Sequence, residues 1–182
     1  MVPISDLKLI ELIQDPKTKD RGFQLLMDYY QQRVYGIIRK MLIVHEDSDD
    51  VLQNTFIKAF RNIHKFNGKS TLFTWLYRIA VNESLNFLES KKRRFFFPID
   101  DHHEVMENYL DKSPLIDGDK IQKFLQKAIL KLPEKQRLIF NLRYYEDLSY
   151  EEISQITDTS VGALKASYHH AVKKIEEQIK SF

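Results

Sequence analysis

Hydrophobic residues recur every three or four positions along almost the whole chain, which is the pattern of amphipathic α-helices. A short first helix is expected to be capped by Ser5 and to end before Pro16. The next helix runs from about residue 20 to residue 42. Its apolar positions are Phe23, Leu26, Met27, Tyr30, Val34, Ile37, Ile38, Met41 and Leu42.

Two further helices are predicted before residue 91. The first spans about residues 48–66 and ends at Asn67 and Gly68, a pair that favours a turn. Ser70 is expected to cap the second helix. Trp75, the only tryptophan in the chain, lies among polar residues on this helix rather than in its apolar stripe. That stripe consists of Leu72, Leu76, Ile79, Ala80 and Phe87.

The helical pattern is interrupted at residues 91–119, where two prolines, a glycine and mixed charges predict a linker. Helical spacing returns at Ile121, and Pro133 suits the first turn of another helix that ends near Tyr145. We therefore expect an all-α protein of two small helical domains. The predicted boundaries are residues 1–92 for the first domain, 93–119 for the linker and 120–182 for the second domain.

The final segment has the pattern of a helix-turn-helix. Ser149 and Glu152 form a capping box at the start of a short helix that continues through Ile156. After a break at residues 157–159, Ser160 is expected to cap a second helix with small and basic residues on its exposed arc. This pattern is typical of DNA-binding helix pairs. It also fits a three-helix packing unit with a solvated basic face.

Composition adds a few constraints to this picture. The chain has 182 residues with only five glycines and five prolines, which disfavours a fold rich in β-turns. The net charge of +2 does not by itself indicate nucleic acid. The charges are nevertheless sorted, since residues 45–50 are acidic, residues 91–94 are basic and lysines recur after Val161. Separate patches are expected where different surfaces meet different partners.

Several classes of protein are disfavoured by what the sequence lacks. The chain contains no cysteine, which excludes disulfides and Cys-ligated zinc. Its first residues do not resemble a signal peptide, and no apolar run reaches the length of a membrane span. We therefore expect a cytoplasmic protein without membrane insertion. No glycine-rich phosphate loop or metal-ligand spacing supports an enzyme, a cofactor or a metal site.

Two long motifs, in this order and joined by a linker, resemble a sigma factor of the sigma-70 family in its short extracytoplasmic-function (ECF) group. The stretch "DSDDVLQNTFIKAFRNIHKFNGKSTLFTWLYRIAVNESLNFL" is similar to sigma region 2, and "LPEKQRLIFNLRYYEDLSYEEISQITDTSVGALKASYHHAVKKIEEQI" is similar to region 4. The resemblance implies binding to core RNA polymerase, promoter recognition and help in opening the DNA at the minus-10 element. It also implies an anti-sigma partner.

The resemblance places polymerase binding on the helix at residues 48–66. An acid-x-x-Gln motif falls on Asp50 and Gln53, and the family uses this motif on the polymerase clamp. With Ile57 and Phe60 these residues form a second stripe beside the core stripe of the helix. An apolar anchor framed by polar groups suits an interface. The residues alone also fit a helix that is buried on two sides within its own domain.

The resemblance assigns the loop "FNGKS" at residues 66–70 and the start of the following helix to the non-template strand at the minus-10 element. Unpaired bases stack on aromatic side chains, and extruded bases are read by hydrogen bonds in a pocket. The predicted contacts are Asn67, Lys69, Ser70, Thr71, Thr74, Trp75, Arg78 and Asn82. Alternatively, Trp75 covers the edge of the core. Residues 91–94 either bind phosphate or are cations placed at a helix C-terminus.

The second helix of the helix-turn-helix is predicted to read the minus-35 element in the major groove. The predicted contacts are Ser160, Ala163, Lys165, Ser167, His169, His170 and Lys173. The sequence departs from the family where members often carry Ser-Arg in place of Ala166 and Ser167, and arginine in place of His170. Two strong cations are thus missing, and a neutral histidine gives little counterion release. Which residues read bases therefore stays open, and a solvated histidine pair is the alternative.

A DNA-binding regulator that uses only the C-terminal helix-turn-helix is the alternative to a sigma factor. Its N-terminal half would then be a sensor or a dimerisation module. The two possibilities are distinguished by whether the N-terminal domain carries a polymerase-binding surface.

Overall fold

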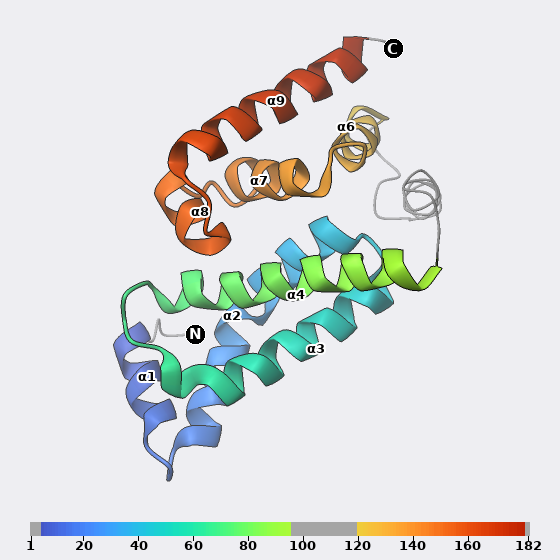
Figure 1. The fold of residues 1–182 in the computed structure, drawn as a ribbon. Coiled ribbons are helices and arrows are strands. Elements are labelled where there is room, and N and C mark those ends of the chain that lie inside the picture. The colour runs from blue at the N-terminus through green and yellow to red at the C-terminus, as the bar shows by residue number, and fades with distance from the viewer. Residues whose placement is uncertain (1–4, 96–119, 181–182) are drawn as a thin grey trace.

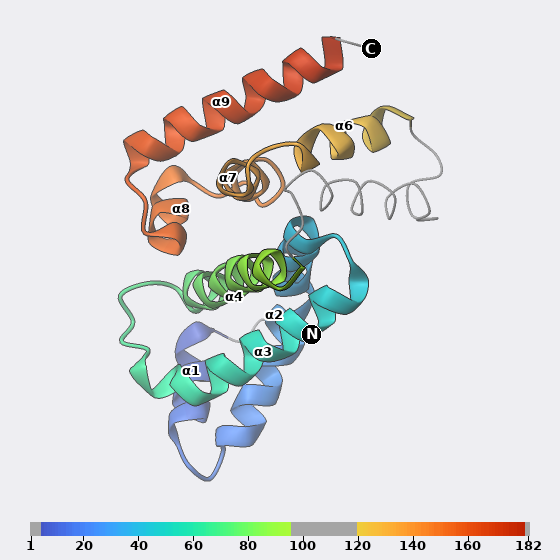
Figure 2. The ribbon, with the colours of Figure 1, turned by 45° about the vertical axis from the view of Figure 1, so that its right-hand side comes forward.

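Every element of the computed structural model is a helix within the residues it describes, 5–95 and 120–180 (Figures 1 and 2). The predicted all-α class is therefore confirmed. The elements are α1 (Asp6–Gln14), α2 (Lys19–Leu42), α3 (His45–Asn62), the short 3-10 helix η1 (Ile63–Lys65), α4 (Leu72–Phe95), α6 (Lys120–Leu130), α7 (Glu134–Tyr144), α8 (Tyr150–Thr157) and α9 (Val161–Lys180). Along the described ranges, no helix combines the length and the apolar character needed to cross a membrane.

Helices α1 to α4 pack around the first hydrophobic core. Ser5 caps α1 as predicted, since its Oγ accepts a hydrogen bond from the amide of Lys8 at 3.3 Å. Helix α1 packs tightly against α2 at Gly22, where an added Cβ would lie 2.8 Å from Leu12 Cβ and 2.9 Å from the backbone nitrogen of Ile13. Only a residue without a side chain fits this contact, so α1 is seated firmly on α2.

The connection between α3 and α4 differs in detail from the prediction. Helix α3 ends at Asn62 and is followed by η1, and Gly68 adopts a positive φ of 72° in the loop. Thr71, rather than Ser70, caps α4, because Thr71 Oγ1 accepts a hydrogen bond from the Thr74 amide at 3.1 Å. The Ser70 hydroxyl instead donates to the carbonyl of Thr71. The predicted cap was therefore wrong by one residue.

Helices α6 to α9 form the second domain, and its predicted caps are confirmed. Ser149 Oγ accepts from the Glu152 amide at 3.2 Å, while the Ser149 amide donates to Glu152 Oε2 at 2.8 Å. Helix α8 ends at Thr157 and is followed by its C-cap Asp158, which has a positive φ of 53°, and Ser160 caps α9 through the amide of Ala163. The pair α8 and α9 therefore has the predicted helix-turn-helix form. The predicted linker at residues 93–119 begins within α4, and its residues 96–119 lie outside the described ranges.

The two domains pack directly on each other, with α8 against α4 and α7 against α2 (Figures 1 and 2). Arg137 is only 2% exposed and donates to the carbonyl of Met41 at 3.2 Å. Asn141 Nδ2 donates to the carbonyl of Lys40, also at 3.2 Å. The last carbonyls of a helix lack partners within that helix. Side chains of the second domain thus complete the C-terminal end of α2.

A partly buried polar cluster around Glu146 reinforces this contact. The Glu146 carboxylate accepts from Lys40 Nζ at 2.7 Å and from the Tyr77 hydroxyl at 3.0 Å. The same hydroxyl lies 3.1 Å from the carbonyl oxygen of Arg33. Burial, together with the nearby negative charge of Glu146, raises the pKa of the Tyr77 phenol. Tyr77 therefore keeps its proton and remains a donor at the domain boundary.

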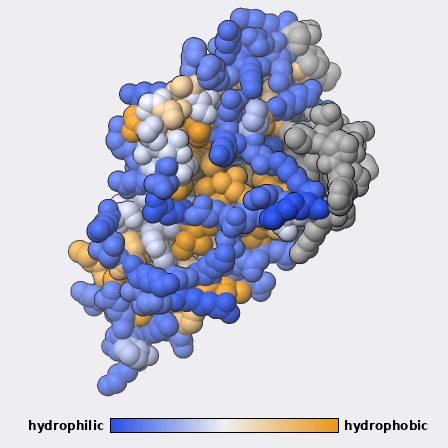
Figure 3. All heavy atoms as spheres, viewed as in Figure 1, coloured by the Kyte–Doolittle hydropathy of each residue, from blue (hydrophilic) through white to orange (hydrophobic). Residues whose placement is uncertain are grey.

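Apolar side chains of both domains merge into one continuous cluster at this boundary. Hydrophobic side chains show through near the middle of the face in Figure 3, on an otherwise mostly hydrophilic surface. The residues that the second domain adds to the core of the first are Leu130, Leu138, Ile139, Leu142, Leu148, Ile153, Ile156 and Leu164. The described chain is therefore packed as one body, which the sequence pattern of two domains did not indicate.

Candidate functional site

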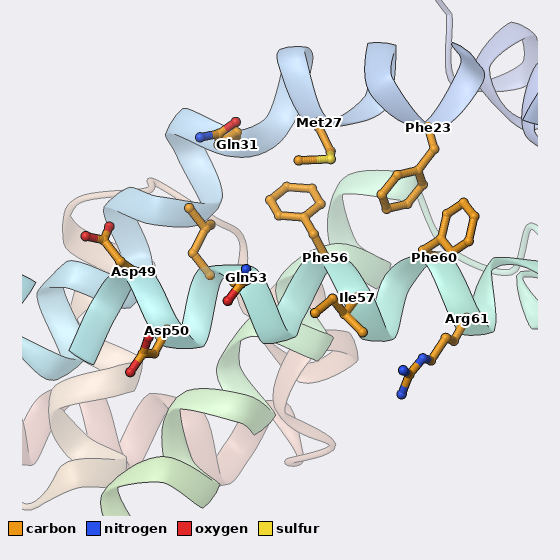
Figure 4. A pocket seen from close by; sticks show the side chains of 11 residues that line it. Phe23, Met27, Gln31, Asp49, Asp50, Gln53, Phe56, Ile57, Phe60 and Arg61 are labelled. Carbon is orange, nitrogen blue, oxygen red and sulfur yellow. The ribbon is translucent and has the colours of Figure 1, made fainter. Parts of the chain in front are cut away.

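An open groove of about 890 Å³ runs along the outer side of α3, between α3 and α2 (Figure 4). It contains all four residues predicted to bind polymerase. Its lining consists of Phe23, Met27, Gln31, Asp49, Asp50, Leu52, Gln53, Phe56, Ile57, Phe60 and Arg61.

The two ends of the groove differ in chemistry. Asp49 and Asp50 make one end acidic, whereas Phe23 and Phe60 form an aromatic wall at the other, with ring centroids 4.9 Å apart (Figure 4). Ile57 lies between them and is 42% exposed. The groove can accept a segment that offers apolar side chains to its middle and a cation to its acidic end.

The exposure pattern of α3 tests the alternative that the helix is buried on two sides. Asp50, Gln53 and Ile57 are exposed, and only Phe60 of the predicted stripe is partly covered by its own domain. Lys19 Nζ lies 4.2 Å from the centroid of the Phe60 ring, and Phe23 packs against the same ring. The stripe is thus available at the surface.

A second pocket of about 510 Å³ lies between the end of α3 and the middle of α4. Of the residues predicted to contact the minus-10 element, Trp75 and Asn82 line it. The full lining is Lys58, Asn62, Lys65, Trp75, Ile79, Asn82, Glu83, Leu85 and Asn86. The pocket thus combines an indole, three side-chain amides, two lysines and the carboxylate of Glu83, which pairs with Lys58.

Trp75 both packs at the edge of the core and lines the second pocket. Its ring is half-buried and meets the ring of Phe66 edge-on, with centroids 5.7 Å apart. It also belongs to the pocket wall. The indole therefore covers the edge of the core with one side and borders the polar pocket with another.

The remaining predicted minus-10 residues do not form one surface. Thr74 is only 3% exposed, and its hydroxyl lies 2.9 Å from that of Thr71, so its side chain belongs to the cap of α4 rather than to a DNA-facing surface. Arg78 points toward the helix-turn-helix, where its guanidinium lies 4.0 Å from Asp158. In the loop, Asn67 and Lys69 are exposed.

Five polar residues of the pocket were not predicted from the sequence: Lys58, Asn62, Lys65, Glu83 and Asn86. The first three recur at intervals of four and three, so they share one face at the end of α3 and in η1. This periodicity was visible in the sequence. Their proximity to Trp75 was not, because it depends on how α3 and α4 cross.

Two lysines near the end of α4 are partnered by carboxylates of the protein, and the side chain of Arg94 lies outside the described residues. Lys91 pairs with Asp47, and Lys92 pairs with Glu134 of the second domain at 2.8 Å. These pairs favour the structural interpretation of the two lysines over phosphate binding.

The predicted minus-35 residues extend from the cap of α9 to Lys173. Ala163, Lys165, His169, His170 and Lys173 are exposed, Ser167 is half-buried and Ser160 is the helix cap. The opposite side of α9 is buried through Leu164, Ala171 and Ile175. The arc is therefore free on the surface of the described chain, with a modest positive charge.

Comparison with known families gives two matches that together cover most of the chain. The model described as Sigma-70 region 2 matches residues 26–94, and the model described as Sigma-70, region 4 matches residues 125–175.

Similar proteins extend the match to almost the full length. The chain is 36% identical to the ECF RNA polymerase sigma-E factor of Haemophilus influenzae, covering 97% of this chain and 96% of that protein. It is 32% identical to the Escherichia coli protein of the same name, covering 97% and 95%. It is 31% identical to the RNA polymerase sigma-H factor of Pseudomonas aeruginosa, covering 96% and 93%.

Two solved structures share the fold. The sigma factor RpoE of Bartonella quintana, in complex with the anti-sigma factor NepR, aligns with a TM-score of 0.69 at 20% identity, covering 88% of this chain and 98% of that one. CnrH in complex with the cytosolic domain of CnrY aligns with a TM-score of 0.67 at 19% identity, covering 97% and 95%.

Proposed function

The chain belongs to the ECF sigma factors of the sigma-70 family, and we propose that its two domains divide the work of promoter recognition between separate surfaces. It is a sigma factor that binds core RNA polymerase and directs transcription initiation at promoters. As a member of this family it is an initiation factor and not an enzyme. The N-terminal half matches sigma region 2, which argues against a DNA-binding regulator that uses the helix-turn-helix alone.

The observation that carries this function is the presence of both sigma regions, in order, in a chain that aligns with sigma factors over 97% of its length. Reconstituted transcription tests it. The purified chain is added to core polymerase with genomic DNA as the template, and the start sites are mapped. We expect specific start sites that share two upstream elements. Initiation without chain-dependent start sites would contradict the function.

The groove between α2 and α3 is the proposed polymerase-binding surface. Its apolar middle at Ile57 and Phe60 would bury against the partner, while Asp50 and Gln53 fix orientation through hydrogen bonds. Charged and polar groups at the edge of an interface set register and specificity more than affinity. The complementary partner is therefore a polymerase segment with apolar side chains and a cation aimed at the acidic end.

Replacing Asp50 with Arg together with Gln53 with Ala is expected to weaken core binding by about tenfold or more. The reversed charge would repel the proposed cation, and both side chains are exposed, so the melting temperature should stay nearly unchanged. Binding is measured by titrating core polymerase against each variant, and folding by thermal unfolding.

A matched control keeps the same chemistry elsewhere on α3. Glu46→Arg with Asn54→Ala makes equivalent changes at exposed positions that do not line the groove. This control should bind core like the wild type. Equal weakening by both double variants, or a large fall in the stability of the first, would show that the groove is not the specific surface.

The pocket beside Trp75 is the proposed site for an unpaired base of the minus-10 element. An indole offers a stacking surface worth about 1–3 kcal/mol per base, and the nearby amides can bond to base edges. Lys65 adds positive charge for the sugar-phosphate backbone, whereas Lys58 is paired with Glu83 within the pocket. The exposed loop with Asn67 and Lys69 continues this surface at the start of α4.

The exposed arc of α9 is the proposed reader of the minus-35 element. Lys165 is the exposed cation near the start of the helix, and its Nζ lies 5.7 Å from the centroid of the Tyr150 ring. His169 and His170 are exposed on the same arc and offer ring nitrogens to base edges or phosphates.

Lys165→Ala is expected to weaken duplex binding about equally across sequences and to lower the salt slope by about one counterion. The measurement is a titration of minus-35 duplexes at several salt concentrations. Lys180→Ala, at the far end of the same helix, serves as the control and should leave the slope unchanged. A loss confined to one base sequence would instead make Lys165 a base-reading residue.

The two domains must separate to read both elements at once. Two elements that are two helical turns apart lie about 70 Å apart along the DNA. Here α4 touches α8 and α8 touches α9, so across this stack of helices the two DNA surfaces lie within about three helix diameters, roughly 30–36 Å. The packed arrangement is therefore proposed to be a resting form that opens on the polymerase.

We also propose that the chain acts in the cytoplasm, where polymerase and promoter DNA are found, and that an anti-sigma factor controls it. One of the similar solved structures is a complex with an anti-sigma factor and aligns over 88% of this chain. A partner that binds the packed arrangement would delay its opening.

A further inference from the structure

A single carboxylate in the first helix fixes the start of α4. Asp6 Oδ2 accepts a hydrogen bond from the backbone amide of Leu72 at 3.1 Å, across 66 positions of sequence. Its other oxygen, Oδ1, accepts from the hydroxyl of Tyr30 at 2.8 Å. Asp6 thus joins three helices, α1, α2 and α4.

The bonded amide is one that the helix itself cannot satisfy. Leu72 is the first residue of α4, and the first amides of a helix have no partner within it. Thr71 Oγ1 accepts from Thr74, while Asp6 accepts from Leu72. A negative charge at this end also interacts favourably with the helix dipole. The cap of α4 is therefore built from two distant parts of the chain.

The contacts that hold Asp6 in place are rigid. Burial, together with the hydrogen bond to Asp6, raises the pKa of the Tyr30 phenol, so Tyr30 keeps its proton and stays a donor. The close approach of α1 to α2 at Gly22 leaves α1 little room to shift. Leu72 is fully buried, so the amide that Asp6 binds does not move independently of the core.

The loop that precedes Leu72 is held at both ends. At its start, Phe66 donates its amide to the carbonyl of Ile63 and packs its ring against Trp75. At its end, the amide of Leu72 donates a hydrogen bond to Asp6. Between these points, Asn67 and Lys69 are exposed. The position of the loop relative to the Trp75 pocket thus depends on both attachments.

We propose that Asp6 is a positioning residue for promoter opening: through Leu72 it sets the placement of the loop at residues 66–71 and of the adjacent Trp75 pocket. This inference rests on the proposed minus-10 role of that surface. Asp6 does not itself contact DNA. It limits the arrangements of the loop before DNA arrives, and a preorganised site loses less entropy on binding.

The experiment uses Trp75, the only tryptophan, as its reporter. A single-stranded oligonucleotide is copied from the non-template strand of a start site mapped with the wild-type chain. Its binding to the full chain is followed by Trp75 fluorescence. In parallel, promoter opening is measured with core polymerase on duplex DNA and on a template already melted at the start site.

Asp6→Ala is expected to weaken oligonucleotide binding and duplex opening by roughly tenfold, and to change activity on the melted template much less. Asp6→Asn keeps an acceptor for the Leu72 amide and should recover most of the loss. Glu11→Ala removes an exposed carboxylate from the same helix and should behave as wild type. All assays are run well below the melting temperature of each variant.

The outcomes separate this inference from the proposed function. If the wild type shows no fluorescence change and no opening, the minus-10 surface itself is misassigned. If the wild type responds and Asp6→Ala responds equally, Asp6 has no positioning role. A loss of core affinity equal to the loss of opening would mean that Asp6 only supports the fold.

Discussion

Covalent joining of the two domains is expected to abolish transcription from promoters that carry both elements. The chain has no cysteine, so thiols introduced at Lys40→Cys and Glu146→Cys would be its only ones. These positions face each other across the domain boundary, where Lys40 Nζ and Glu146 Oε1 are 2.7 Å apart. A short bismaleimide would hold α2 against the second domain. Elements about 70 Å apart would then be out of reach of one of the two surfaces.

The same double variant without the crosslinker should transcribe, which separates the effect of the bridge from that of the substitutions. Gln136→Cys with Lys174→Cys is the matched control, because these side chains are hydrogen-bonded at 3.1 Å within the second domain. Its crosslinked form should keep most of its activity. Transcripts are counted from a template with both elements, and mass spectrometry verifies each bridge. Wild-type output from the chain bridged at residues 40 and 146 would refute domain separation.

The second large effect is expected at Trp75. Truncation to alanine removes the stacking surface of the proposed base pocket, worth about 1–3 kcal/mol, or about 5- to 150-fold in opening of duplex promoter DNA. A template that is already melted needs less of this energy, so it should lose much less activity. The rate of opening is followed on both templates with the same holoenzyme preparation.

Trp75 also packs against Phe66, so its truncation removes contacts from the domain edge. Trp75→Phe keeps an aromatic face and should retain much of the opening activity. Thermal unfolding of both variants measures the structural part of the loss. Equal losses on duplex and melted templates would show that the indole supports the fold or the polymerase contact instead.

The sequence by itself determined the features that lie within single helices. Spacing by threes and fours placed the core positions of α2, and the side-chain chemistry of Ser149 and Glu152 placed the start of α8. The stripe of Asp50, Gln53 and Ile57 could be found because all three lie on one helix. Such patterns follow from a fixed turn of about 100° per residue, which needs no knowledge of the rest of the fold.

Only the tertiary structure determines which residues far apart in the sequence come into contact. Asp6 meets Leu72 across 66 positions, and Tyr77 meets Glu146 across 69, and no periodicity links such residues. The pocket beside Trp75 exists because α3 packs on α4 and places Lys58 near the indole. Thr74 is buried because its hydroxyl is hydrogen-bonded to that of Thr71 in the cap of α4. These outcomes depend on the angles and depths at which helices cross. Many side chains set those angles together, so the role of each residue appears only once the chain is packed.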